Sequence, residues 1–251
     1  MVWDPTQYDK FERERAAPFF DLLDLVEKRK GISVVDLGCG TGKLTQILSD
    51  ALPESQVTGI DNSEAMLEKA RPLAGDRLRF EHGTVEELSG SWHLIFSNAA
   101  LHWIPDHAAL LPKLWSMIQP GGQLAVQVPS NHNHMAHRMI FDLGKTEPYA
   151  TKLSHWTRVS PVQDIDWYGN VLFKLGAKNI RVSERIYPGF MEDSDAVVEW
   201  NKGTVMVPYK EKLGDLWPQF LEAYRQKLKQ AWPDSPLMYG YRRTLFAAQK
   251  P

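Results

Sequence analysis

The sequence predicts an α/β protein: a doubly wound, mostly parallel, seven-stranded sheet with a helical insertion before its last strand. Strand and helix patterns alternate regularly up to residue 129, which is typical of parallel strands joined by crossover helices. A glycine cluster at residues 38–42 stands where the first strand pattern turns into the first helix pattern. Doubly wound folds bind their ligands at such a turn.

The elements of the first half follow from apolar runs and capping residues. Short apolar runs predict buried strands at 32–37, 56–60, 77–81, 92–97 and 123–128. Apolar residues at helical spacing predict a helix over 44–51 and a second one after the N-cap Ser63. A third helix is expected from the N-cap Asp106 to Ile118, and Pro120-Gly121-Gly122 is expected to end it.

The rhythm changes after residue 129. Residues 130–160 are polar and without a clear period, and they include His132, His134 and His137. The remaining patterns predict a helix and a strand within 161–187, two helices within 193–232 and a last strand over 239–248. Together with a helical segment at 6–29, this organisation predicts a single domain over 1–251.

Composition narrows the classes of function. The 251 residues carry 29 Lys and Arg against 31 Asp and Glu, so no basic excess points to nucleic acid or a membrane surface. The single cysteine, Cys39, excludes an internal disulfide framework and a multi-cysteine metal site. Because no long apolar run or secretion signal is recognisable, we expect a cytoplasmic protein without nucleic-acid or membrane partners. A monomer is the working expectation, although the sequence does not determine the oligomeric state.

The glycine loop has the pattern Asp-x-Gly-x-Gly-x-Gly, from Asp36 to Gly42. A P-loop would need Gly-Lys-Ser/Thr, but Leu44 follows Gly42-Lys43, and a dinucleotide fingerprint would need its third glycine one residue later. Asp61 ends the second strand, where a carboxylate can accept both hydroxyls of an adenosine ribose.

This pattern resembles motif I of the Rossmann-like, class I methyltransferases that use S-adenosyl-L-methionine (SAM) and release S-adenosyl-L-homocysteine. An acidic residue such as Asp36 suits a sulfonium cation, whereas it would repel a pyrophosphate. Leu37, Ile60 and Met66 are expected to form the apolar surroundings of the adenine.

The order of motifs over nearly the whole chain resembles the trans-aconitate 2-methyltransferase family. The resemblance is carried by three segments: 3–18, with Trp-Asp-Pro-Thr-Gln-Tyr at its start; 96–107, Phe-Ser-Asn-Ala-Ala-Leu-His-Trp-Ile-Pro-Asp-His; and 124–129, followed by Asn131. It implies a lid at 6–29, a SAM-binding core at 30–129 and an acceptor-side insertion at 130–160 and 193–232. It also implies that Asn98 and Ala99 contact the methionine portion and face the methyl group.

Thr84 stands where the family usually has the adenine-binding Asp, so the backbone around Val85 is expected to share that role. The expected cofactor-binding residues are Tyr8, Arg15, Asp36, Gly38, Cys39, Gly40, Asp61, Asn62, Met66, Thr84, Val85, Asn98 and Ala99. The expected acceptor-binding residues are His102, Trp103, Asn131, Arg158 and Arg243, with His102 open to a structural role instead.

If the acceptor is a small-molecule carboxylate, it is already ionised at neutral pH, so no catalytic acid or base is expected. Cys39 is expected to pack rather than to act as a nucleophile. An anionic acceptor calls for arginines, for which Arg15, Arg158, Arg185 and Arg243 are candidates. Two arginines expected from the family are replaced, by Ala17 before Pro18 and by Val207 before Pro208.

Other interpretations remain open. Lys202-Gly203-Thr204 and residues 236–239 are also similar to methyltransferases that esterify malonyl-acyl carrier protein. Transfer to another small molecule, or SAM binding without turnover, is equally compatible with the glycine loop. No metal is expected, because no known metal-binding motif surrounds His132, His134 and His137. These histidines are interpreted as solvated loop residues or as residues that face the acceptor.

Overall fold

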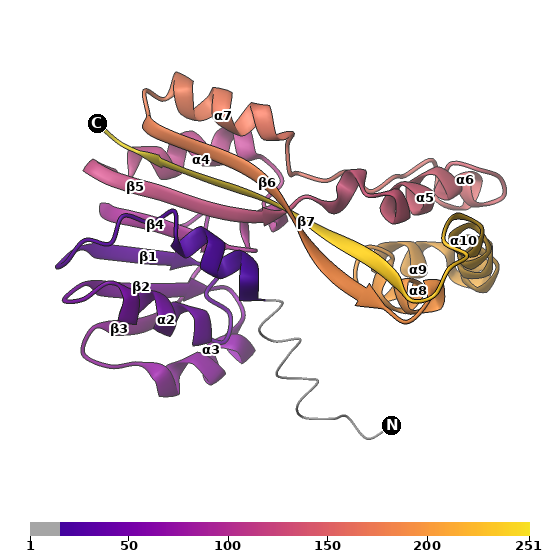
Figure 1. Cartoon of the computed structure of the whole chain (residues 1–251), viewed down its shortest axis with the longest axis horizontal. Helices are drawn as coiled ribbons and strands as arrows, with labels where there is room; N and C mark the ends of the chain where they lie inside the picture. Colours follow the sequence, from indigo (N-terminus) through magenta and orange to yellow (C-terminus); the bar gives the residue numbers. More distant parts are fainter. Residues whose placement is uncertain (1–15) are drawn as a thin grey trace. The chain divides into compact units, whose positions relative to one another are not determined.

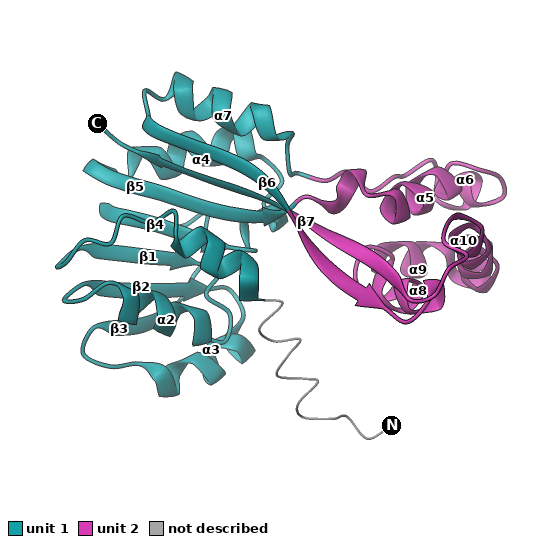
Figure 2. Ribbon diagram, in the orientation of Figure 1, with its two compact units in different colours: residues 1–129, 161–185, 243–251 teal, residues 130–160, 186–242 magenta. Residues whose placement is uncertain are grey.

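The computed structural model of the chain describes residues 16–251, so Tyr8 and Arg15 lie outside the described residues. The chain divides into two compact units, coloured separately in Figure 2. The sheet unit comprises the residues up to 129 together with 161–185 and 243–251. The helical unit comprises 130–160 and 186–242.

The sheet confirms the predicted fold class. Its seven strands lie in the order β3-β2-β1-β4-β5-β7-β6, and β7 runs antiparallel to β5 while the pairs from β3 to β5 are parallel (Figure 1). The strands are β1 Ser33–Leu37, β2 Gln56–Asp61, β3 Leu78–His82, β4 Trp92–Asn98, β5 Ile118–Pro129, β6 Lys178–Met191 and β7 Leu237–Gln249. The last two strands each continue into the helical unit.

Helices cover both faces of the sheet, which explains why the strands read as continuous apolar runs. On one face α4 (His107–Ser116) and α7 (Ile165–Lys174) contribute the buried Leu114 and Tyr168 to the core. On the other face the helical residues 16–23 and α2 (Lys43–Ala51) contribute Phe19 and Leu48. The connections α3 (Glu64–Ala70), η1 (Arg71–Leu73) and η2 (Leu101–Trp103) complete this unit.

The end of α4 differs from the sequence prediction. Asp106 caps the helix as predicted, accepting the N–H of Ala109 at 3.0 Å. The helix ends at Ser116, however, and the Pro-Gly-Gly segment expected to stop it lies inside β5. The prediction was wrong because a distant segment supplies the pairing: Gly121 N–H donates to Lys250 at 3.0 Å, and Lys250 N–H donates to Gly122 at 2.8 Å.

The helical unit is richer in helix than predicted. Residues 130–160, expected to lack a period, contain η3 (Asn131–Asn133), α5 (Met135–Gly144) and α6 (Tyr149–Lys152). Residues 193–232, expected to form two helices, contain α8 (Ser194–Lys202), α9 (Val207–Leu213), η4 (Gly214–Leu216) and α10 (Trp217–Ala231). The core of this unit is rich in aromatic residues, and the rings of Tyr209 and Phe220 stack with their centroids 5.6 Å apart.

Candidate active site

The glycine loop leaves β1 and opens α2. Gly38, Gly40 and Gly42 have φ angles of 78°, 56° and 76°, the left-handed region that glycine adopts without steric strain. The N–H groups of Gly38 and Cys39 donate to the carbonyl of Ile60 at 2.8 and 3.0 Å. The loop is therefore anchored to the carboxyl end of β2, beside Asp61.

The three glycines have different reasons to lack a side chain. A Cβ on Gly38 would lie 2.1 Å from the Cβ of Ala100, and one on Gly42 would lie 2.7 Å from the ring of Phe80. A Cβ on Gly40 would meet nothing within 4 Å. Gly38 and Gly42 thus serve packing, whereas the space above Gly40 fits a ligand that approaches the backbone closely.

Asp61 is held rigidly at this loop. Its Oδ2 accepts the N–H of Gly40 at 2.8 Å, and its Oδ1 accepts the N–H of Ser63 at 2.9 Å. Each carboxylate oxygen has a further lone pair, so the group can still accept two hydroxyls of a ribose. The residue donors and acceptors at this edge therefore fit the adenosine part of SAM.

Asp36, just before the loop, and Cys39, within it, both have buried side chains. Asp36 accepts the hydroxyl of Thr45 at 2.6 Å, and burial raises the pKa of Asp36 to about 6. Burial, with the nearby Asp36 and Asp61, raises the pKa of the Cys39 thiol to about 12. The thiol therefore stays protonated at neutral pH and packs against the backbone of Gly59, as the sequence predicts.

Asn98 and Ala99 end β4 in an unusual conformation. Ala99 has a φ of 55°, which an alanine adopts only at a cost, and its N–H donates to the carbonyl of Gln127 at 2.9 Å. The buried Oδ1 of Asn98 has no hydrogen-bond partner among residues 16–251. An unsatisfied buried acceptor fits a site for a ligand donor, such as the ammonium group of the methionine portion.

The residues expected around the adenine differ in exposure: Leu37 is fully buried in the core of the sheet unit, whereas Thr84 and Val85 are half-buried. The hydroxyl of Thr84 donates to the Glu87 carboxylate at 2.9 Å and accepts the N–H of Glu87 at 3.3 Å. One lone pair of the hydroxyl therefore remains for the adenine amine that the sequence interpretation assigns to it. Val85 follows on the same turn, packed against the core. Met66 is 42% exposed, and the carbonyl of Asn62 bonds to His82 Nε2 at 3.2 Å.

The expected acceptor residues fall in both units. In the sheet unit, His102 and Trp103 form η2 with ring centroids 4.7 Å apart, and Trp103 is 70% exposed. Arg243 lies in β7 opposite Pro129. Arg185 in the same unit forms an ion pair with Asp21 at 2.5 Å, so its charge is already compensated.

In the helical unit, the side-chain Oδ1 of Asn131 accepts the N–H of Arg242 at 2.7 Å, which gives Asn131 a structural partner. The guanidinium of Arg158 is half-buried, and this burial lowers its pKa. It donates to the carbonyl of Val205 at 3.3 Å, and no carboxylate among residues 16–251 forms an ion pair with it. A half-buried cation without a carboxylate partner favours binding of an anion.

The histidines of residues 132–137 are not simply solvated loop residues. His134 caps α5 by accepting the N–H of Ala136 at 3.2 Å and lies 4.5 Å from the ring of Tyr239. Burial lowers the pKa of His137 to about 4. Within the described part of the chain, no three His, Cys, Asp or Glu side chains gather as metal ligands would.

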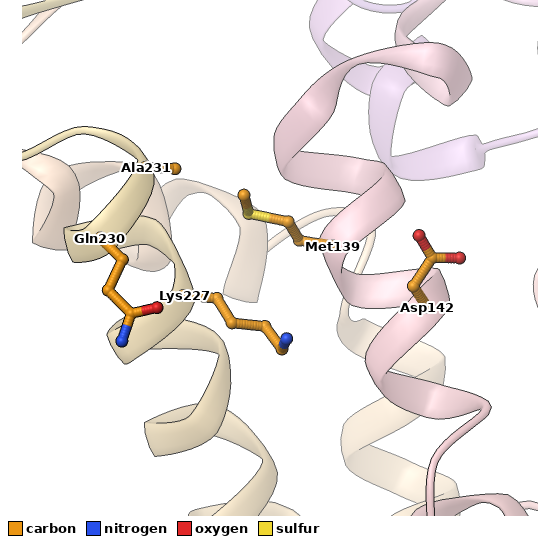
Figure 3. Close-up of a pocket in the computed structure, with 5 residues that line it drawn as sticks. All are labelled: Met139, Asp142, Lys227, Gln230 and Ala231. Atoms are coloured by element: carbon orange, nitrogen blue, oxygen red, sulfur yellow. The ribbon is translucent and has the colours of Figure 1, made fainter.

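A surface pocket of about 360 Å³ lies between α5 and α10 of the helical unit. Figure 3 shows Met139 and Asp142 on one wall and three residues of α10 on the other, Lys227, Gln230 and Ala231. None of the residues expected to bind cofactor or acceptor lines it. Among residues 16–251, no helix combines the length and apolar character needed to cross a membrane.

The sequence interpretation missed Gln127. This residue of β5 is 1% exposed, and its Nε2 has no hydrogen-bond partner within residues 16–251. It lies opposite Asn98 in the sheet. The available signal was a lone polar residue inside the apolar run Leu124–Pro129.

The fold and the glycine loop define a SAM-dependent methyltransferase of the Rossmann-like class. A family model described as a methyltransferase domain matches residues 34–122. The chain is 43% identical to trans-aconitate 2-methyltransferase of Deinococcus radiodurans, with 100% of this chain and 99% of that protein covered. It is 35% identical to the enzyme of the same name from Variovorax paradoxus, again over 100% and 99% of the two chains. The chain belongs to the trans-aconitate 2-methyltransferase family.

Solved structures agree at the level of the fold. The YcgJ protein of Bacillus subtilis superimposes with a TM-score of 0.61 at 14% identity, covering 93% of this chain and 98% of its own. Phosphoethanolamine N-methyltransferase 2 of Haemonchus contortus, in complex with SAM, superimposes with a TM-score of 0.55 at 16% identity, covering 94% of this chain and 52% of its own.

Proposed function

We propose that this chain transfers the methyl group of SAM to a carboxylate of trans-aconitate or of a closely similar small organic acid. The observation that carries the proposal is the match over the full length of relatives named trans-aconitate 2-methyltransferase, since it includes the acceptor-side segments as well as the core. The structure adds compatible chemistry: an open glycine loop, a fixed carboxylate at Asp61 and an unsatisfied acceptor at Asn98.

Bound SAM supplies an electrophilic methyl group on its sulfonium. The chain's contribution is to align the two reactants and to exclude water around the attacking oxygen. In this proposal Asp61 holds the ribose, Gly40 lets the cofactor approach the backbone, and Asn98 with Ala99 orients the methionine portion. The acceptor is ionised at neutral pH, so the proposal assigns no general base.

Arginines are the proposed recognition groups for the acid. We assign this role to Arg243 in the sheet unit. We assign it independently to Arg158 in the helical unit, because the Arg158 guanidinium is half-buried and forms no ion pair among the described residues. His102 and Trp103 stay proposed acceptor contacts. Ala17 and Val207 replace two arginines of the family pattern, so a smaller acid is a natural competitor for trans-aconitate. The charge balance remains the reason to expect no nucleic-acid partner, and a monomer in the cytoplasm remains a working expectation.

The test is a methyl-transfer assay with labelled SAM against trans-aconitate, a panel of small dicarboxylates and malonyl-acyl carrier protein. Methyl ester formation on trans-aconitate or one dicarboxylate would support the proposal. Transfer only to the carrier protein would replace it with the alternative acceptor.

A pair of variants tests the role of Arg158. Arg158→Gln should raise the KM for the acceptor without changing the affinity for SAM. Arg225→Gln should leave the KM for the acceptor unchanged, because Arg225 is already paired with Asp195 at 2.8 Å.

A further inference from the structure

We propose that Gln127 binds a carboxylate oxygen of the methyl acceptor through the N–H₂ of its side-chain amide. This inference rests on the proposed function and adds a specificity-determining residue to it. It starts from a buried donor that the fold leaves unused. Gln127 is 1% exposed, yet its Nε2 has no hydrogen-bond partner among residues 16–251. Buried side-chain amides are normally satisfied, so an unsatisfied one calls for a ligand or water to complete it.

A second glutamine on the same strand shows what a structural amide looks like here. Gln123 lies four residues earlier in β5, on the same face of the sheet, and is 8% exposed. Its Nε2 donates to the carbonyl of Leu25 at 2.7 Å, and its Oε1 accepts the N–H of Glu27 at 2.9 Å. The Gln123 amide thus ties down a chain segment, whereas the donor of Gln127 does not.

The neighbour of Gln127 is also unsatisfied. Asn98 of β4 is its register partner in the parallel pair, so the two side chains lie on the same face. The Oδ1 of Asn98 is buried without a partner in the described part of the chain, so this acceptor and the Nε2 of Gln127 do not bond each other. The ends of β4 and β5 therefore present one free acceptor and one free donor side by side.

The position of Gln127 in the sheet favours the methyl acceptor over the cofactor. The glycine loop follows β1, Asn98 ends the adjacent strand β4, and Gln127 lies on β5, one strand further out. One strand spacing is about 4.8 Å, so Gln127 lies beyond Asn98 as seen from the cofactor loop. Asn98 is the proposed contact of the methionine portion, and the next group outward is the one that receives the methyl.

Charge on this face points to an anion. Gln127 pairs with Leu245 of β7, and Arg243 lies two residues before Leu245, on the same face. A side-chain N–H₂ only donates, and a guanidinium only donates, so both match the oxygens of a carboxylate. The pairing of Pro129 with Arg243 keeps this arginine at the carboxyl end of β5, beyond Gln127.

The test compares Gln127→Leu and Gln127→Glu with the matched control Gln123→Leu in the full-length protein. Both Gln127 variants should raise the KM for the acid at least tenfold and leave the dissociation constant of SAM within about twofold. Gln127→Glu should be the weaker binder because it places a carboxylate against the acid, and being isosteric it tests the idea even if the leucine variant does not fold. Gln123→Leu should lower the melting temperature and leave the KM for the acid unchanged.

Three results would overturn the inference. An unchanged acid KM in Gln127→Glu, with an active wild-type enzyme, would remove Gln127 from the acceptor site. A higher dissociation constant for SAM, with an unchanged KM for the acid, would assign the Gln127 amide to the cofactor instead. A wild-type enzyme that methylates no carboxylic acid would overturn the proposed function first, and this inference with it.

Discussion

The carboxylate of Asp61 and the backbone N–H of Gly40 are joined by a hydrogen bond of 2.8 Å across 21 residues of chain. This bond ties the glycine loop after β1 to the end of β2. The other oxygen of Asp61 fixes the start of the next helix through Ser63 N–H at 2.9 Å. The two bonds therefore fix the position of the Asp61 carboxylate, the proposed ribose acceptor, and of the loop that SAM is proposed to approach.

Replacing Asp61 by Ala should weaken SAM binding by about 1.5–3 kcal/mol, because a charged hydrogen-bond acceptor is lost. Titration calorimetry measures the change as roughly a tenfold to hundredfold rise in the dissociation constant. Asp106→Ala is the control, since Asp106 also accepts a backbone N–H, that of Ala109, but outside the loop. Equal SAM affinity in Asp61→Ala and wild type would remove Asp61 from the ribose role.

Replacing Gly40 by Ala should impair SAM binding while the protein stays folded. The added Cβ meets nothing within 4 Å in the protein, so its effect falls on the ligand that uses this space. The positive φ adds strain of about 1–2 kcal/mol to the folded state. Gly31→Ala is the matched control, because Gly31 has a φ of 67° and equally open surroundings outside the loop. If both variants bind SAM equally, no ligand approaches Gly40 closely.

The glycine loop and its acidic partner were predictable as structural features because their signals are local. A strand that ends in Asp-x-Gly-x-Gly-x-Gly, followed by a second strand ending in Asp61, specifies the loop and its acidic partner within about thirty residues of chain. The capping role of Asp106 is likewise encoded by its immediate neighbours.

The misassigned parts depend on distant partners or on mixed composition. Gly121 and Gly122 are strand residues only because Lys250 pairs with them. In α5 the buried Ala136 and Ile140 recur at helical spacing, but the polar residues between them, including His137, hid the period. The unused donor of Gln127 is a property of the folded sheet, and the sequence shows only that a polar residue interrupts an apolar run.

The stability of the protein should depend on pH through Asp36. Its pKa is 3.8 in an ordinary environment and about 6 in the folded protein, so burial disfavours the charged form. Below about pH 4 the raised pKa costs the folded protein no stability, because Asp36 is protonated in both the folded and the unfolded state. As pH rises from about 4 to 6, the free energy of unfolding falls by about 3 kcal/mol. Asp36→Asn should remove this loss, so its advantage over wild type in free energy of unfolding should grow between about pH 4.5 and 7.5.

Urea unfolding of both proteins at each pH measures this difference. Comparing the two proteins is necessary because burial lowers the pKa of His107 and His137, which changes stability in the opposite direction as pH falls. Both histidines are present in both proteins, so their contributions cancel. A difference between variant and wild type that stays constant across this range would contradict the raised pKa of Asp36.

Tyr168 and His107 form a buried hydrogen-bonded chain that holds the turn carrying His102 and Trp103. The carbonyl of Leu101, in that turn, can only accept, so His107 Nε2 carries the proton and donates to it at 2.9 Å. His107 Nδ1 then accepts the hydroxyl of Tyr168 at 2.7 Å. The oxygen of Tyr168 in turn accepts the N–H of Gln163 at 3.2 Å, so every group in the chain is used once.

Replacing Tyr168 by Phe should lower the free energy of unfolding by about 1–3 kcal/mol, because it leaves two buried groups, His107 Nδ1 and Gln163 N–H, without a partner. The ring itself is preserved, including its stacking on Phe246 at 4.5 Å, so the loss reports the hydroxyl alone. Tyr149→Phe is the control, a buried ring packed against Phe220 at 5.0 Å for which no hydroxyl bond is found within residues 16–251. Equal urea midpoints for the two variants would mean that the hydroxyl of Tyr168 does not stabilise the turn.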